Sequence, residues 1–165
     1  MLESTTKTFK AILVIVTALC LIGCHHDNPL TIGSSRGIDE RLIGAWRYRD
    51  KNERGIYTFM RRGGGEYFGQ IAIIGEKPLY FRAYFSTVEG VDILNMQEVG
   101  STIAIGKGKY AFFTYQFTPQ GKLILSSIQL DSKQDAPSFA LRREIGNRLA
   151  EGTLKVSSQT LTRVK

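Results

Sequence analysis

Residues 42–49 read LIGAWRYR, and this short stretch indicates the fold class of the chain. Small or apolar residues at every second position, including Trp46 and Tyr48, alternate with Arg47 and Arg49. A period of two places the first set on one face of an extended strand and the arginines on the other face. The stretch therefore predicts a β-strand with one buried face at the start of a folded domain.

The same alternation recurs along the rest of the chain. Further strands are predicted for residues 54–61, 66–74, 79–88, 91–97, 101–105, 109–117, 122–130 and 158–164. Glycine, proline or polar residues bound these segments, and Glu89-Gly90 is typical of a short hairpin connection. Short strands at intervals of about ten residues predict a mainly β domain, either a closed barrel or a β-sandwich.

One helix is predicted near the C-terminus. Leu141, Ile145 and Leu149 recur at every fourth position, which is typical of the buried stripe of an amphipathic helix. Asp135 is predicted to cap the start of this helix and Gly152 its end. The outer face of the helix is predicted to be basic and to carry Arg142, Arg143 and Arg148.

The N-terminus has the order of a secretory signal peptide. Lys7 and Lys10 precede the uncharged apolar residues 11–22, AILVIVTALCLI. A helix of that length rises about 18 Å, which is short of the roughly 30 Å hydrocarbon core of a bilayer. A cleaved signal peptide is therefore a better interpretation than a permanent membrane-spanning anchor.

The apolar segment ends in Leu21-Ile22-Gly23-Cys24, which resembles the lipobox of bacterial lipoproteins. The resemblance implies cleavage after Gly23, a diacylglycerol on the Cys24 thiol and an acyl chain on the new amino group. Two or more acyl chains anchor a protein stably, at about 0.8 kcal/mol per buried methylene. Because His25 rather than aspartate follows the cysteine, the resemblance also implies the outer membrane of a Gram-negative bacterium, with the domain facing the periplasm. In a Gram-positive bacterium the anchor would lie in the plasma membrane.

Processing at this site divides the chain into three parts. Residues 1–23 are the signal peptide, residues 24–40 the lipidated cysteine with a polar, flexible tether, and residues 41–165 the β domain. Cleavage removes Cys20 and lowers the formal charge from +7 to +6, because two lysines and one glutamate are lost. The mature domain has no cysteine for a disulfide, and its modest charge without a long basic run argues against nucleic-acid binding.

Gly44-Ala45-Trp46 opens the first predicted strand of the domain and resembles the Gly-x-Trp signature of lipocalins and their calycin relatives. The resemblance implies a lipocalin-like, antiparallel up-and-down barrel over residues 41–165. It also implies that Trp46 packs across the closed end of this barrel, under a basic side chain from near the C-terminus. Arg163 is the first candidate for that side chain, with Arg142 or Arg143 as substitutes.

Side chains suited to catalysis or metal binding are scarce in the predicted domain. The only histidines, His25 and His26, adjoin the lipidated cysteine in the predicted tether, where no fixed geometry would hold a metal ion. Residues 41–165 contain no histidine or cysteine to act as a general base or nucleophile. We therefore expect no enzyme activity, no metal and no cofactor.

Two functions remain, and both depend on binding. In the first, the barrel takes a small hydrophobic ligand between inward-facing aromatic side chains. These are Tyr48, Tyr57, Phe59, Phe81, Phe85, Phe113 and Tyr115. In the second, the chain is a structural accessory or an enzyme inhibitor that binds an envelope protein through the opposite face of one strand, at Tyr80, Arg82 and Tyr84. An enclosed apolar cavity of about 300 Å³ or more would favour the first function.

Overall fold

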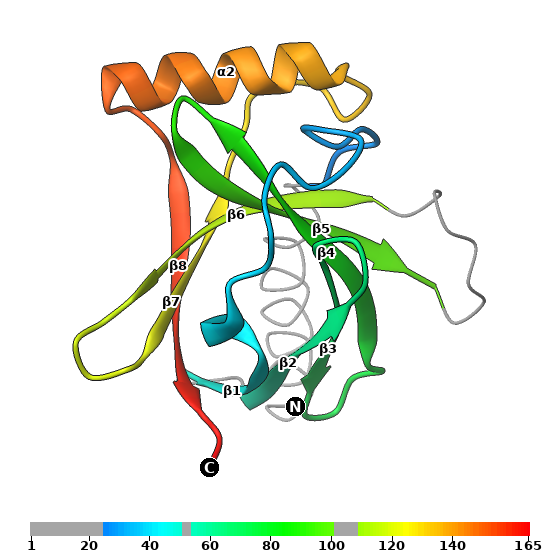
Figure 1. The fold of residues 1–165 in the computed structure, drawn as a ribbon, viewed down its shortest axis with the longest axis vertical. Helices are drawn as coiled ribbons and strands as arrows, with labels where there is room; N and C mark the ends of the chain where they lie inside the picture. The colour runs from blue at the N-terminus through cyan, green and yellow to red at the C-terminus, as the bar shows by residue number, and fades with distance from the viewer. Residues whose placement is uncertain (1–24, 51–53, 101–108) are drawn as a thin grey trace, which may run out of the picture.

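The computed structural model describes residues 25–50, 54–100 and 109–165. Within these residues, eight antiparallel strands form a closed up-and-down barrel in which β8 pairs with β1 (Figure 1). The strands are β1 (Gly44–Arg49), β2 (Arg54–Arg62), β3 (Glu66–Ile73), β4 (Leu79–Val88), β5 (Val91–Val99), β6 (Tyr110–Phe117), β7 (Leu123–Ile128) and β8 (Val156–Arg163). The barrel is the predicted fold class, and the alternative of a β-sandwich is wrong.

The strands begin and end close to their predicted bounds, because alternation and turn residues mark them in the sequence. The Glu89-Gly90 connection is a tight hairpin turn in which both residues have positive φ, at 48° and 74°. The weak strand predicted for residues 101–105 lies outside the described residues.

A single α-helix among the described residues, α2 (Ser138–Glu151), follows β7 and lies across the top of the view in Figure 1. Leu141 and Ile145 are fully buried, and Gly152 ends the helix in the left-handed conformation at φ 67°, as the sequence predicts. The predicted cap at Asp135 is wrong: Pro137 occupies the N-cap position, and no side chain bonds to the first turn.

The predicted basic outer face of α2 is correct only in part. Arg143 is exposed. Arg148 turns back toward the barrel instead, where its guanidinium lies 2.7 Å from Glu144 and donates a hydrogen bond of 3.2 Å to the carbonyl of Gln129. Arg148 therefore ties the helix to the end of β7 rather than extending into solvent.

Buried side chains form two separate cores. The inner core fills the barrel and includes Trp46, Phe59 and Phe81. The outer core lies on the outside of β4 to β6 and includes Tyr84 and Phe112, beneath α2 and the N-terminal segment. Strands with apolar side chains on both faces must be shielded from water on both faces. On the outer face of β4 to β6, α2 and the N-terminal segment provide this shielding.

The N-terminal segment, residues 25–39, is not the flexible tether that the sequence predicts. The backbones of His26 and Tyr110 exchange two hydrogen bonds of 2.7 Å, and the N–H of Leu30 donates to the side chain of Asn95 at 3.0 Å. His26 is only 3% exposed and Leu30 only 1%. The segment thus packs along the barrel and leads into the short 3-10 helix η1 (Glu40–Leu42), in front of the barrel in Figure 1.

Candidate ligand-binding cavity

One end of the barrel is closed by Trp46 and Arg163. The Trp46 indole N–H donates to the carbonyl of Leu42 at 2.8 Å, which fixes the ring beneath η1. The Arg163 guanidinium carbon lies 4.4 Å from the centre of that ring, and its Nη1 donates to the carbonyl of Ile43 at 2.9 Å. This is the contact predicted from Gly44-Ala45-Trp46, and such a cation–π pair contributes about 0.5–2 kcal/mol.

The substitutes proposed for Arg163 lie elsewhere. Arg142 donates to the carbonyl of Thr87 at 3.3 Å, and Arg143 faces solvent on α2. Of the three candidates, only Arg163 reaches the tryptophan.

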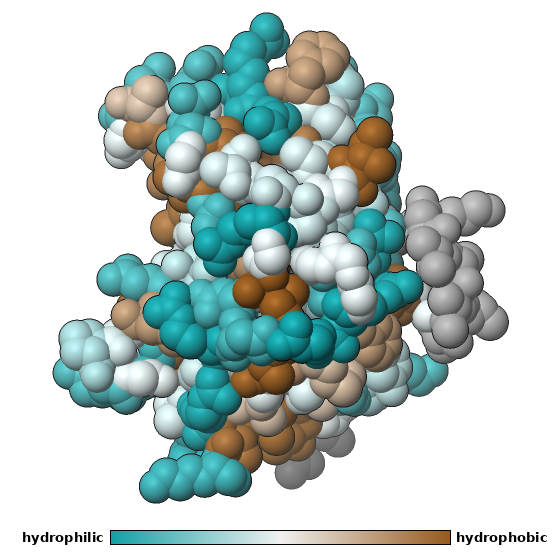
Figure 2. Space-filling view, in the orientation of Figure 1, coloured by the Kyte–Doolittle hydropathy of each residue, from teal (hydrophilic) through white to brown (hydrophobic). Residues whose placement is uncertain are grey.

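Two more arginines, which the sequence analysis missed, close the same end. The guanidinium carbon of Arg36 lies 4.4 Å from the ring centre of Phe85, and that of Arg41 lies 4.7 Å from the ring centre of Phe117. Both come from the segment before β1. Figure 2 shows the surface of this end, which is mostly hydrophilic with small separate hydrophobic areas.

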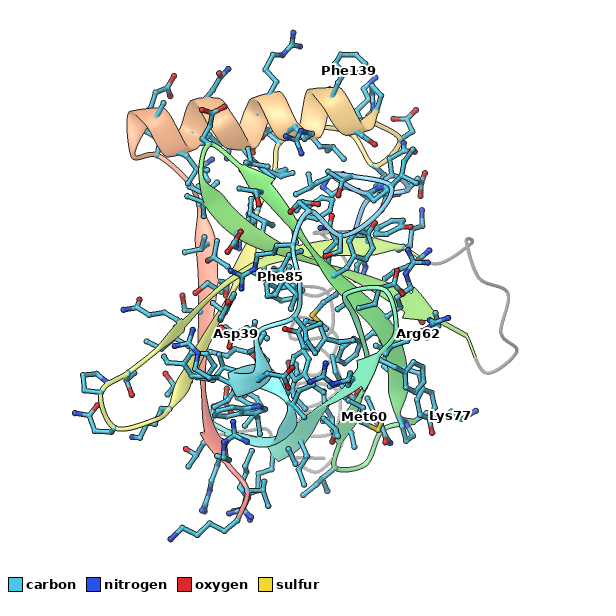
Figure 3. The ribbon with its side chains drawn as sticks, viewed as in Figure 1. Asp39, Met60, Arg62, Lys77, Phe85 and Phe139 are labelled. Carbon is cyan, nitrogen blue, oxygen red and sulfur yellow. The ribbon has the colours of Figure 1, made fainter. Side chains whose placement is uncertain are left out.

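Asp39, which is labelled in Figure 3, joins Arg41 to Tyr115 on the barrel wall. Its carboxylate accepts hydrogen bonds from Arg41 Nε at 3.0 Å and from the Tyr115 hydroxyl at 2.9 Å. The hydrogen bonds from Arg41 hold the pKa of Asp39 at about 2. Burial raises the pKa of Tyr115 to about 12, so its hydroxyl stays protonated and donates throughout the neutral range.

Aromatic rings fill the middle of the barrel. Phe59 packs edge-on against Phe81 with ring centres 5.3 Å apart, and Phe85 packs against Tyr115 at 5.5 Å. The Phe81 ring also occupies space beside Gly69, where a Cβ atom would lie only 2.2 Å from Phe81 Cζ. The middle is therefore a solid core rather than a channel.

A cavity of about 180 Å³ lies at the other end of the barrel. Its wall consists mainly of inward-facing residues of β2 to β6, which are Tyr57, Ile71, Ile73, Leu79, Phe81, Met96, Ala111 and Phe113. The volume is below the roughly 300 Å³ at which ligand pockets usually begin. The cavity thus has room for part of a hydrophobic ligand rather than for a whole one.

All seven predicted aromatic residues belong to the inner core or pack against it. Only Tyr57, Phe81 and Phe113 line the cavity, whereas the other four fill the barrel elsewhere. The aliphatic part of the wall, such as Met96 and Leu79, was missed. The sequence does indicate these aliphatic residues, because they occupy the same alternating, inward-facing strand positions as the aromatic residues.

Charged and polar side chains surround the mouth of the cavity. They are His25, Glu76, Lys77, Glu98 and Lys109. Lys109 forms an ion pair with Asp27. Burial lowers the pKa of His25 despite the nearby Glu98, so the imidazole is neutral at pH 7. His26 points elsewhere and stacks on Phe112, with ring centres 5.5 Å apart.

The strand face predicted to bind a protein partner is largely covered, which corrects that hypothesis. Tyr84 is fully buried, and its hydroxyl donates to the carbonyl of Thr31 at 2.7 Å. Arg82 lies 3.4 Å from Glu66 in an ion pair and sits over the Tyr84 ring. Only Tyr80, at 38% exposure, remains accessible.

No group of three or more His, Cys, Asp or Glu side chains in the described parts of the chain is placed to hold a metal ion. No helix in these parts is both long and apolar enough to cross a membrane.

In the part of the chain that the structure describes, fold and cavity together define a small β-barrel with one closed end and one open end, compatible with a lipocalin-like fold. Comparison of the chain with models of known families, with curated proteins and with solved structures found no match.

Proposed function

We propose that this chain is a lipoprotein of the bacterial envelope, anchored through acyl chains on Cys24, whose barrel binds an apolar group in the cavity at its open end. The single observation that carries the binding role is the asymmetry of the barrel. One end is closed by three arginine–aromatic contacts, whereas the other retains an apolar cavity with a charged mouth.

The size of the cavity limits the ligand class. A space of about 180 Å³ suits the end of an acyl chain or one small ring. The remainder of such a ligand would lie outside, where Lys77, Glu98 and Lys109 supply charge for its polar group. We therefore propose an amphiphilic ligand, held by apolar contact and released unchanged.

The lipobox and the preceding apolar segment support the anchor. In addition, the described chain begins at His25, on the rim of the cavity. A lipidated Cys24 would therefore attach directly beside the mouth, because consecutive Cα atoms are only about 3.8 Å apart. We also propose that the anchor lies in the outer membrane and that the barrel faces the periplasm.

Energy transfer from tryptophan tests ligand binding. Trp46 is the only tryptophan of the chain and lies inside the barrel, so transfer from it to a dansyl-labelled fatty acid reports a probe bound there. The full acylated chain is purified into nanodiscs, and unlabelled fatty acid is used as the competitor. We expect saturable transfer that the competitor abolishes.

A matched pair of variants assigns the signal to the cavity. Ala111→Leu adds bulk to the cavity wall, whereas Ala45→Leu makes the same change on the outward face of β1. Ala111→Leu is expected to weaken probe binding about tenfold, equivalent to about 1.4 kcal/mol, and Ala45→Leu to leave it unchanged. Equal binding by both variants would rule out the cavity as the site.

A further inference from the structure

Three arginines lie together on the outside of the barrel beside its open end. Arg47 and Arg49 of β1 and Arg54 of β2 are all exposed and share the outward face, and the strand register places Arg49 directly opposite Arg54. Like charges opposite each other on neighbouring strands destabilise a sheet. None of the three forms an ion pair with another described residue. Within residues 25–50, 54–100 and 109–165, the cluster therefore has no ion-paired carboxylate that would offset its repulsion.

Two exposed isoleucines adjoin these arginines. Ile56 lies opposite Arg47 and is 39% exposed. Ile74 is 78% exposed, and its N–H donates to the carbonyl of Arg54 at 3.0 Å. The five residues, which we call the arginine–isoleucine patch, line a surface groove of about 530 Å³.

The composition of the patch suits an anionic lipid surface. A guanidinium matches the oxygens of a phosphate group in a two-pronged hydrogen bond. Exposed apolar side chains beside basic ones enter the boundary between headgroups and acyl chains. A soluble anion would satisfy the arginines but would leave Ile74 in water, so a bilayer fits the whole patch better.

The path of the chain brings the proposed anchor to the same end. Two backbone hydrogen bonds with Tyr110 hold His26 in place. Cys24 is two residues earlier, so at most about 7 Å of extended chain separates the acyl chains from this fixed point. Ile73 lines both the cavity and the groove, which places the cavity mouth and the patch at one end of the barrel.

We propose that the barrel stands with its open end on an anionic lipid surface, with the three arginines on lipid phosphates and Ile74 at the acyl boundary. This orientation rests on the proposed anchoring at Cys24. The cavity then opens toward the bilayer, and the apolar group that it takes is part of a membrane lipid.

Fluorescence quenching by brominated lipids tests the orientation. The full acylated chain is placed in vesicles of equimolar phosphatidylglycerol and phosphatidylcholine with bromine on the acyl chains. A fluorophore is attached at Ile74→Cys in one sample and, as a control, at Gln120→Cys in the exposed β6–β7 turn of the closed end. We expect several-fold stronger quenching at position 74 than at position 120. Equal quenching would overturn the proposal.

Charge reversal separates docking from folding. Arg54→Glu removes the repulsion with Arg49, so the unfolding midpoint should stay the same or rise. The ratio of docked to undocked protein should nevertheless fall about tenfold or more, because basic side chains supply the attraction to anionic lipid. Arg143→Glu on α2 is the matched control and should change neither. Undiminished quenching at position 74 in Arg54→Glu would contradict the proposal.

The same samples show whether a negative result refutes the proposed orientation or the anchoring at Cys24 on which the orientation rests. Protein that fails to float with the vesicles refutes the anchor at Cys24. Protein that floats but shows no quenching at position 74 refutes the orientation alone. A floating dimer with position 74 shielded from both lipid and water would assign the patch to a second copy of the chain and would also refute the proposal.

Discussion

The hydroxyl of Tyr115 donates a 2.9 Å hydrogen bond to Oδ2 of Asp39, and this bond joins the wall of the barrel to the segment that closes it. Asp39 also accepts hydrogen bonds from Arg41, which itself lies over Phe117. The closed end is thus held by a connected set of polar contacts above an aromatic core. Its stability should depend on the charge of one carboxylate.

Acid should loosen the closed end. Asp39 has a pKa of about 2 in the folded chain against an ordinary value of 3.8, so the folded state binds its proton more weakly than the unfolded state. The resulting stabilisation is complete above about pH 4 and is lost as the pH falls toward 2. Urea midpoints of the wild type and of Asp39→Asn, measured across this range, should converge as the pH falls. Parallel curves would contradict the role given to Asp39.

The cation–π contact at the closed end should contribute measurably to stability. Arg163→Met removes the charge over Trp46 and the hydrogen bond to Ile43, and we expect it to lower the free energy of unfolding by about 1–3 kcal/mol. Arg143→Met on the exposed face of α2 is the control and should change it by less than about 0.5 kcal/mol. Chemical denaturation followed by Trp46 fluorescence provides the measurement. Equal effects of the two changes would show that the contact contributes nothing specific.

Glycine is required at position 69 by its neighbours. A Cβ atom there would lie 2.2 Å from Phe81 Cζ and 2.3 Å from the backbone oxygen of Thr58. Gly69→Ala should therefore destabilise the barrel by about 3 kcal/mol or more, at the upper end of overpacking effects. Gly63→Ala has no atom within 4 Å of the added carbon and serves as the control. Similar melting temperatures for the two variants would refute the close packing of Phe81 on β3.

Mild acid should release the start of the N-terminal segment. Burial lowers the pKa of His26 below its ordinary 6.5, although the Lys133 backbone, Glu144 and Asp27 partly oppose this shift. His26 therefore binds a proton more readily when the segment is released than when it is packed. As a result, the packing of the segment weakens as the pH falls through about 6.5. Hydrogen exchange at the Tyr110 amide, which donates to the His26 carbonyl, should accelerate between pH 7 and pH 5 once intrinsic rates are corrected. His26→Phe, which keeps the stacking on Phe112, should abolish this dependence.

The strands were predictable from the sequence because local patterns specify them, whereas the barrel and the Trp46–Arg163 contact were expected from the resemblance of Gly44-Ala45-Trp46 to the lipocalin signature. Alternation marks both faces of a strand, and Gly44-Ala45-Trp46 marks the strand that closes the barrel. The packing of residues 25–39 was not predicted, since it consists of irregular backbone without a repeating pattern. An indirect signal existed all the same: Tyr84 and Phe112 are aromatic residues on the outward face, and burying them requires another element.

The position of the cavity was not predictable in the same way. Alternation indicates which side chains point inward, but not which of them meet across the barrel. Phe59, Phe81 and Phe85 fill the middle because Gly69 leaves space on β3 and because arginines cover one end. The open end depends on these long-range contacts, and a single strand does not encode them.

Mass spectrometry of the chain recovered from bacterial membranes tests the central claim most directly. If the chain is an anchored lipoprotein, the mature protein begins at Cys24, and its first peptide carries the mass of a diacylglycerol together with an amide-linked acyl chain. Cys24→Ala should eliminate this species. Recovery of the full-length chain from the cytosol, with residues 1–23 still attached and an unmodified thiol at position 24, would contradict the account.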